Sequence, residues 1–143
     1  MKHKILISFF ITFLSLNSKA QQVINDDGDS IRCTGKIWTK CEKSATFSNS
    51  DSTNIKLLKD AVKKSDEIFY GITIFDMIVN ANGETKEVNV IETNMNNFNK
   101  LKSLFKQINY KFNAAMHNRR KVCFFQKIKI SIIDDFYEIK CLK

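Results

Sequence analysis

The 143-residue sequence contains no proline, only four glycines and only two histidines. The lack of proline excludes a proline-rich spacer, and the scarcity of glycine excludes a collagen-like repeat or a glycine-rich arm. Two histidines leave little with which to build a histidine-based metal site or catalytic site. Apolar residues make up 43% of the chain and charged residues 27%, as in an ordinary globular domain. The composition therefore argues against an enzyme.

The first twenty residues show the pattern of a secretory signal peptide. A basic start at residues 1–4 precedes an apolar run at residues 5–16, and small residues follow at Ser18 and Ala20. The alternative is a retained inner-membrane anchor, but this apolar run would rise only about 18 Å as a helix, against a hydrocarbon core of roughly 30 Å. We therefore expect cleavage after Ala20 and a periplasmic or secreted protein, and we favour this over anchoring in the inner membrane.

All four cysteines, Cys33, Cys41, Cys123 and Cys141, follow the predicted cleavage site. An even number of cysteines in an exported chain favours two disulfides and no free thiols. Zinc binding is the alternative role of these cysteines. Their spacings contain no C-x2-C pair, however, so no metal site is expected. Three pairings are possible, and proximity in the sequence favours Cys33–Cys41 together with Cys123–Cys141.

Hydrophobic periodicity predicts one α+β domain at residues 36–143, after a flexible leader at residues 21–35. The expected elements are a short strand at 35–41, a helix at 52–65, strands at 70–80 and 85–92 around a type I′ turn at Asn82-Gly83, a helix at 97–112, and strands at 122–133 and 136–142. Ser50 or Ser52 is able to cap the first helix. Strand 70–80 is apolar on both faces, which indicates a central strand with cover on each side. We therefore predict an antiparallel sheet of three or four strands with two helices packed against it.

The hairpin, the second helix and the basic loop after it follow a pattern found in a known family. Residues 71–91 are similar to a G-x-V-x-V-x-F-x-V-x-x-x-G hairpin, residues 98–108 stand where that family has a helix, and residues 110–122 look like its W/F-x-P-A-x-x-N-G-K-x-V loop. With a lead-in at residues 37–42 and Phe47, they resemble the TonB C-terminal domain in its stand-alone, Bacteroidetes-type form. The lead-in prolines, the double glycine, and the proline and glycine of the loop are missing, so the match is degenerate.

The resemblance implies a non-enzymatic periplasmic module that binds an extended segment of a partner protein by strand addition. The partner would be an outer-membrane TonB-dependent receptor or another periplasmic protein, and no cofactor, nucleic acid or small-molecule substrate is implied. In the family, the strand after the basic loop is the edge that accepts the partner. The candidate residues of that edge here are Val122, Phe124, Gln126, Ile128, Ile130 and Ile132.

Residues 136–142 are able to fold back and cover this edge. A two-residue turn at Asp134-Asp135 would place Ile128 opposite Cys141. Cys123 would then lie about 16 Å beyond Cys141 along the strand. That separation is too large for a disulfide, whose Cα atoms lie within roughly 7 Å. The terminal hairpin and a Cys123–Cys141 bridge therefore exclude each other, and we expect an edge that can be exposed.

Two alternatives use the same chain differently. A membrane-anchored TonB-like energy transducer would need residues 5–16 to be retained and a long proline-rich spacer, which the sequence lacks. A small disulfide-stapled domain would instead use its sheet edge for self-association, for example as a homodimer.

His117, Arg119, Arg120 and Lys121 form the densest positive patch of the sequence. Such a patch is able to bind a phosphate or an acidic partner. Short charge runs are usually solvated loops, however, and we favour that interpretation. His117 has no nucleophile or orienting acid near it in the sequence, so we interpret it as an exposed loop histidine and expect no catalytic residue.

Overall fold

The structure, a computed structural model, describes Cys33 and residues 35–143. The signal peptide predicted at residues 1–20 and most of the leader predicted at residues 21–35 lie outside the described residues. The elements of the described part, in chain order, are β1 (Thr46–Phe47), α1 (Asp51–Ser65), β2 (Gly71–Val79), β3 (Thr85–Thr93), α2 (Phe98–Ile108), β4 (Phe112–Asn113), β5 (Ala115–His117), β6 (Arg120–Val122), β7 (Phe124–Ile133) and β8 (Phe136–Leu142). These elements confirm the predicted α+β fold.

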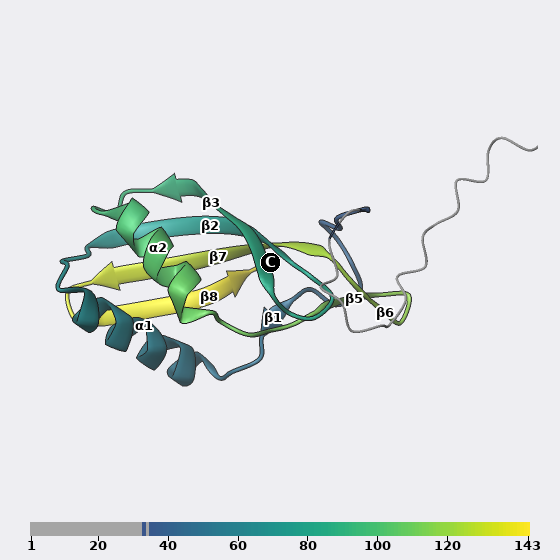
Figure 1. The fold of residues 1–143 in the computed structure, drawn as a ribbon, viewed down its shortest axis with the longest axis horizontal. Helices are drawn as coiled ribbons and strands as arrows, with labels where there is room; N and C mark the ends of the chain where they lie inside the picture. The colour runs from purple at the N-terminus through teal and green to yellow at the C-terminus, as the bar shows by residue number, and fades with distance from the viewer. Residues whose placement is uncertain (1–32, 34) are drawn as a thin grey trace, which may run out of the picture.

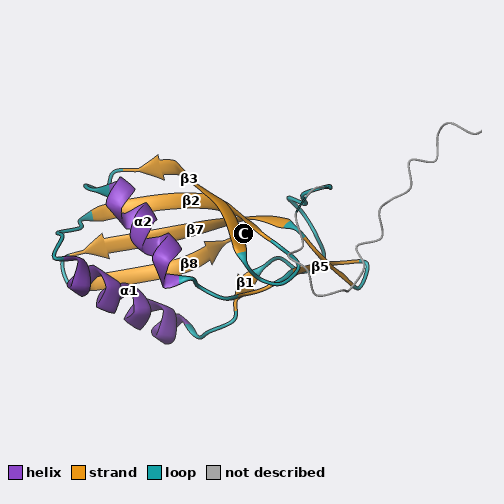
Figure 2. Cartoon of the chain, in the orientation of Figure 1, coloured by secondary structure: helices purple, strands orange, loops and turns teal. Residues whose placement is uncertain are grey.

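Four of the strands form one antiparallel sheet in the order β3–β2–β7–β8. Both helices lie on one face of this sheet, where α1 contacts β8 and α2 contacts β3 (Figures 1 and 2). The other face has no covering element in the described part of the chain, so the expectation of cover on both faces of β2 is wrong. Ile72 and Ile74 are accordingly only half-buried there, because an antiparallel sheet is able to leave one face to solvent.

The hydrophobic core lies between the sheet and the helices. Alternate residues of β2 face it, so Phe75 and Met77 are fully buried, and Phe75 lies opposite Ile128 of β7. Helix α2 covers this part of the sheet with Leu101 and Phe105, and the rings of Phe75 and Phe105 lie 5.4 Å apart. The apolar stripe that the sequence shows along residues 98–108 is thus the buried side of α2.

The turn between β2 and β3 differs from the type I′ turn that we predicted. The N–H of Gly83 donates to the carbonyl of Asn80, and of the loop residues only Gly83, at φ 79°, has a positive φ. The side-chain oxygen of Asn80 accepts hydrogen bonds from the N–H groups of Asn82 and Glu84. A Cβ atom on Gly83 would lie 1.9 Å from the carbonyl oxygen of Phe112, so this position requires glycine.

The helices begin and end at residues with specific backbone conformations. Ser50, one of the two predicted caps, accepts a hydrogen bond from the N–H of Thr53 at the start of α1. Helix α2 ends at Ile108, earlier than predicted, because Asn109 adopts a left-handed conformation, and Phe112 belongs to β4 instead. No helix in the described residues is long and apolar enough to cross a membrane.

The cysteines form one disulfide, Cys33–Cys123, with Cα atoms 6.0 Å apart, and Cys41 and Cys141 are free. The predicted pairing of neighbours in the sequence, and the prediction of no free thiols, are therefore both wrong. The reason lies in the β7–β8 hairpin, which pairs Ile128 with Cys141 as its two-residue turn requires. This register holds Cys141 away from Cys123 along the strand, too far for a disulfide between them.

Candidate functional site

The strand edge that was predicted to accept a partner is covered in this structure. Strand β7 pairs with β2 on one side, and on the other side β8 covers residues 127–133 while Trp38 bridges to Phe124 at the start of the strand. The predicted edge residues Phe124, Gln126, Ile128, Ile130 and Ile132 are buried, and Val122 ends β6. The turn at Asp134-Asp135, with Asp134 at φ 52°, brings β8 back along β7, which is why the expectation of an open edge fails.

Strand β8 is an integral part of the sheet. Ile139 is 2% exposed in the core, with Tyr137 and Cys141 packed beside it. At the far end of the strand, the side-chain amide of Gln126 donates to the carbonyl of Leu142 over 2.9 Å. Burial of this kind stabilises the hairpin by several kcal/mol, on the order of the cost of truncating a core isoleucine. The last strand is therefore not a loosely attached cap.

Charged residues also tie β8 to β7 on the face without helices. Glu138 forms ion pairs with Lys140 at 2.8 Å and with Lys129 of β7 at 3.1 Å. The hydrogen bond from Lys140 lowers the pKa of Glu138 most, and Lys129 lowers it further. All three side chains keep contact with solvent, so we assign this cluster little stabilising energy.

The two outer strands, β3 and β8, differ in the regularity of their free edges. Strand β3 pairs with β2 through two register shifts, and its residue Glu87 has a φ of 50°. Such bulges bend a strand and interrupt its row of backbone groups. Strand β8 pairs with β7 over seven consecutive residues without a shift, and no segment among the described residues pairs with its outer side. Of the two, β8 is the regular edge.

Hairpin geometry identifies the backbone groups that point outward from β8. The two-residue turn closes on the pair Ile133–Phe136, so the N–H of Phe136 points toward β7. Because this orientation alternates along an antiparallel strand, the N–H and C=O groups of Tyr137, Ile139 and Cys141 point away from β7. These three residues supply the hydrogen-bonding groups of the free edge.

Helix α1 contacts β8 on the helix-covered face of the sheet and forms one wall beside this edge (Figure 1). The ammonium group of Lys59 is 5.1 Å from the ring centroid of Tyr137, and Ile55 is half-buried against the core. At the start of the strand, Phe136 is 62% exposed. A strand added beside β8 would thus place its inward side chains next to Tyr137 and Ile55.

A second feature lies at the end of the sheet where β7 begins. We call residues 35–43 together with residues 115–123 the basic finger. Strands β5 and β6 form its hairpin, which turns through Asn118 and Arg119, both at positive φ. The predicted short strand at 35–41 is absent as an element; instead the chain bends at Thr39 and Lys40, and Trp38 pairs with Phe124 as a single bridge. The predicted basic loop is therefore a hairpin with a third segment beside it (Figure 2).

His117 packs against Trp38 within the basic finger. Its ring stacks on Trp38 with centroids 4.0 Å apart, and the ammonium of Lys36 lies 3.9 Å from the Trp38 centroid on the same segment. The Nδ1 atom of His117 is buried and has no hydrogen-bond partner in the described part of the chain. His117 is therefore half-buried, not the exposed loop residue that we expected. In the described residues, no group of three His, Cys, Asp or Glu side chains is placed to hold a metal ion.

The finger brings together cations that lie far apart in the sequence. All six are exposed and none forms an ion pair with a carboxylate that the structure describes: Lys36, Lys40, Lys43, Arg119, Arg120 and Lys121. The only carboxylate in the same segments is Glu42. Sequence reasoning found the hairpin cations but missed the lysines of the first segment. The link between Cys33 and Cys123 and the bridges of Trp38 and Lys43 bring those lysines to the hairpin, and no local pattern in the sequence reports them.

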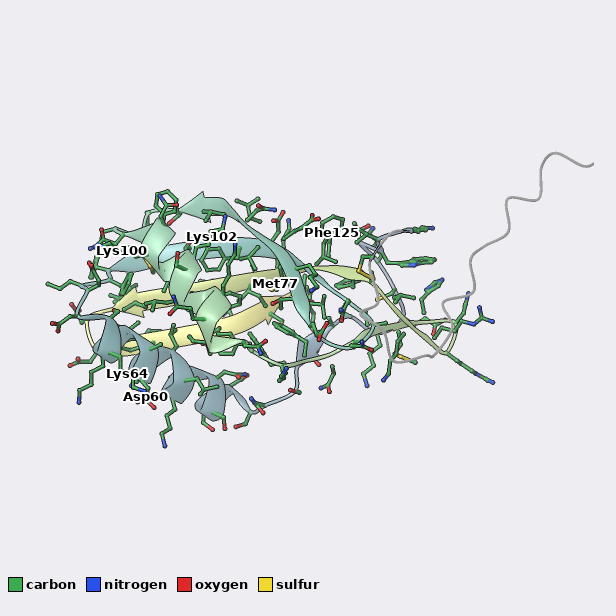
Figure 3. The ribbon with its side chains drawn as sticks, in the orientation of Figure 1. Asp60, Lys64, Met77, Lys100, Lys102 and Phe125 are labelled. Carbon is green, nitrogen blue, oxygen red and sulfur yellow. A yellow bond between two sulfur atoms is a disulfide. The ribbon has the colours of Figure 1, made fainter. Side chains whose placement is uncertain are left out.

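Two hollows of about 400 and 490 Å³ lie between α1 and α2. Their polar lining includes Glu67 and Lys100, which are paired with each other, and Asp60 and Lys64, which project from α1 (Figure 3). Because Glu67 and Lys100 pair with each other, they are not free to orient a ligand as the polar groups of a ligand pocket do. We therefore place the candidate functional site at the β8 edge and the finger.

The chain matches no family model, no curated protein and no solved structure. The resemblance to TonB C-terminal domains accordingly stays a prediction from the sequence.

Proposed function

We propose that this chain is a non-enzymatic protein-binding module that accepts an extended segment of a partner protein as a fifth strand beside β8. The observation that carries the proposal is the regular outer side of β8, which is unpaired in the described part of the chain. Such an edge offers its N–H and C=O groups to an added strand. The resemblance to TonB C-terminal domains supports the same mode of binding, with an outer-membrane receptor or another periplasmic protein as the partner.

We place the docking edge at β8, one strand further out than the β7 edge that the sequence predicted. Binding at β7 would first require β8 to leave, and Ile139 would lose its core contacts. Truncation of a buried isoleucine alone costs about 2–5 kcal/mol, so displacement of the whole strand is expensive. Addition to the outer side of β8 needs no such displacement, and it is therefore the mode we favour.

The surroundings of β8 specify the chemistry of the partner segment. On the side of the helices, the added strand would lie next to Tyr137, Ile139 and Ile55. On the other side it would lie next to Glu138 and Lys140. Because strand side chains alternate, the preferred segment is about five to seven residues long, with apolar residues facing α1 and polar residues facing solvent.

The test begins with a phage-displayed library of random 12-residue peptides selected on the chain without its predicted signal peptide. Calorimetry then compares a selected peptide on the parent chain, on Cys141→Pro and on Cys141→Ala. Proline removes one outward N–H and no bond to β7, whereas alanine removes the same thiol and keeps the N–H. We expect Cys141→Pro to weaken binding about tenfold and Cys141→Ala to leave it unchanged, with circular dichroism reporting that both fold.

Three outcomes contradict the proposal. Either no peptide is enriched, or the selected peptides bind Cys141→Pro as tightly as the parent chain. A dimer of the parent chain in sedimentation, dissociated by Cys141→Pro, would also contradict it, because a second copy would then occupy the edge.

A further inference from the structure

Net positive charge is concentrated on the basic finger, where six exposed cations are accompanied by one carboxylate, Glu42. Arg119 stands in its turn, Arg120 and Lys121 follow on β6, and Lys40 and Lys43 lie on the neighbouring segment. Elsewhere in the described chain, 13 lysines are accompanied by 11 carboxylates, and Lys100, Lys129 and Lys140 each pair with one of them. Exposed cations without counter-charges attract anions and speed their association.

The finger is held in one shape by contacts between its segments. The Cys33–Cys123 disulfide fixes the start of the first segment at the base of the hairpin. Lys43 and Met116 exchange two backbone hydrogen bonds of 3.1 and 2.8 Å, and Trp38 donates to the carbonyl of Cys123 over 2.9 Å. The cations are thus presented on a rigid frame, which lowers the entropy that a bound anion must offset.

The distribution of the cations favours an extended peptide as the binding partner over the flat surface of a lipid bilayer. Consecutive residues of a strand point to opposite faces, so Arg120 and Lys121 lie on opposite sides of the hairpin. The finger extends from the end of the sheet, near Phe125, so its sides are accessible (Figures 1 and 3). A bilayer would reach only one side, and Trp38, stacked between Lys36 and His117, is not available for insertion into lipid.

We propose that the basic finger is a docking site for a carboxylate-rich segment of a partner protein. Arginine forms bidentate hydrogen bonds with carboxylates, and lysines on both faces of the finger neutralise further charges along such a segment. This inference goes beyond strand addition at β8 and does not depend on it, because the finger and the β8 edge are different surfaces.

The experiment titrates a deca-glutamate peptide into ¹⁵N-labelled chain without its predicted signal peptide, followed by NMR. We expect shifts at residues 35–43 and 115–123 and binding that weakens with added salt. Arg119→Glu/Arg120→Glu should weaken binding at least about tenfold, and the charge-matched control Lys63→Glu/Lys64→Glu on α1 should change it less than about twofold. A second variant, Lys40→Glu/Lys43→Glu, replaces the first if the hairpin variant fails to fold.

Three results would overturn the proposal. The first is the absence of binding to the parent chain, and the second is an equal loss in the α1 control. The third is preferential binding to vesicles that contain phosphatidylglycerol, with the peptide unable to compete, because the partner would then be a lipid surface. None of these measurements involves the β8 edge, so their failure leaves strand addition to its own test.

Discussion

Cys141 lies directly opposite Ile128 across the β7–β8 hairpin, with its side chain on the face of the sheet that the helices cover. This pairing makes β8 the outer strand of the sheet. It also separates Cys141 from Cys123, which is joined to Cys33 instead. One register thus determines both the free edge of the sheet and the pairing of the cysteines.

The thiols provide the first prediction. We expect two reactive thiols per chain in the denatured, unreduced protein, from Cys41 and Cys141. Burial raises the pKa of the Cys141 thiol to about 11, so in the native protein its labelling rate should rise about tenfold per pH unit up to that pH. Mass spectrometry after alkylation checks both points, with Cys141→Ala as the control. A denatured protein with no thiol would show that a second disulfide forms and would contradict the structure.

Alkaline pH should destabilise the chain partly through Tyr110. Burial raises the pKa of this phenol above its ordinary value of 10.0. The unfolded state therefore loses this proton first, and the stability that the neutral phenol contributes is complete below pH 10 and is lost as the pH rises above it. Urea titrations between pH 8 and 11 should show that Tyr110→Phe lowers the free energy of unfolding by about 1 kcal/mol at pH 8 and by less at pH 11. A gap that widens with pH would contradict this account.

Strand β8 should respond to core truncation like any central strand. Ile139→Ala should lower the free energy of unfolding by about 3 kcal/mol, because Ile139 is 2% exposed. Phe136→Ala, at a side chain that is 62% exposed in the same strand, should change it by less than about 0.5 kcal/mol. Chemical denaturation measures both. Equal, small effects would mean that β8 is detachable and that β7 is the true edge.

The turn before β3 should tolerate only glycine. Gly83→Ala places a methyl group against the backbone of Phe112 at a positive φ, and we expect a loss of at least about 2 kcal/mol. Gly35→Ala is the matched control, because a Cβ atom on Gly35 would have no atom within 4 Å. We expect it to change the free energy of unfolding by less than about 0.5 kcal/mol. Thermal unfolding of the two variants distinguishes these outcomes. A Gly83→Ala variant as stable as the control would contradict the described turn.

Local signals explain what the sequence predicted correctly. The two-residue turn at Asp134-Asp135 defines the register in which Ile128 pairs with Cys141, although we expected this edge of β7 to be exposed. The spacing of Leu101 and Phe105 predicted the buried side of α2. In each case the information lies within a few residues of the element, where backbone geometry and periodicity determine the outcome.

The features that sequence reasoning missed depend on contacts between distant segments. The disulfide joins Cys33 to Cys123 over a separation of 90 residues, and proximity in the sequence says nothing about it. The stacking of Trp38 on His117, which assembles the basic finger, has the same origin. The end of α2 depends instead on the left-handed conformation of Asn109, which hydrophobic spacing does not report.

Amide hydrogen exchange along β8 tests the central claim, an open and regular edge, most directly. In the free chain, the outward amides of Tyr137, Ile139 and Cys141 should exchange at least about tenfold faster than those of Glu138 and Lys140, which bond to β7. A selected strand-forming peptide should protect the outward amides and leave the inward ones unchanged. If the outward amides are already protected in the free monomer, or if the peptide protects none of them, β8 is not the edge that binds a partner.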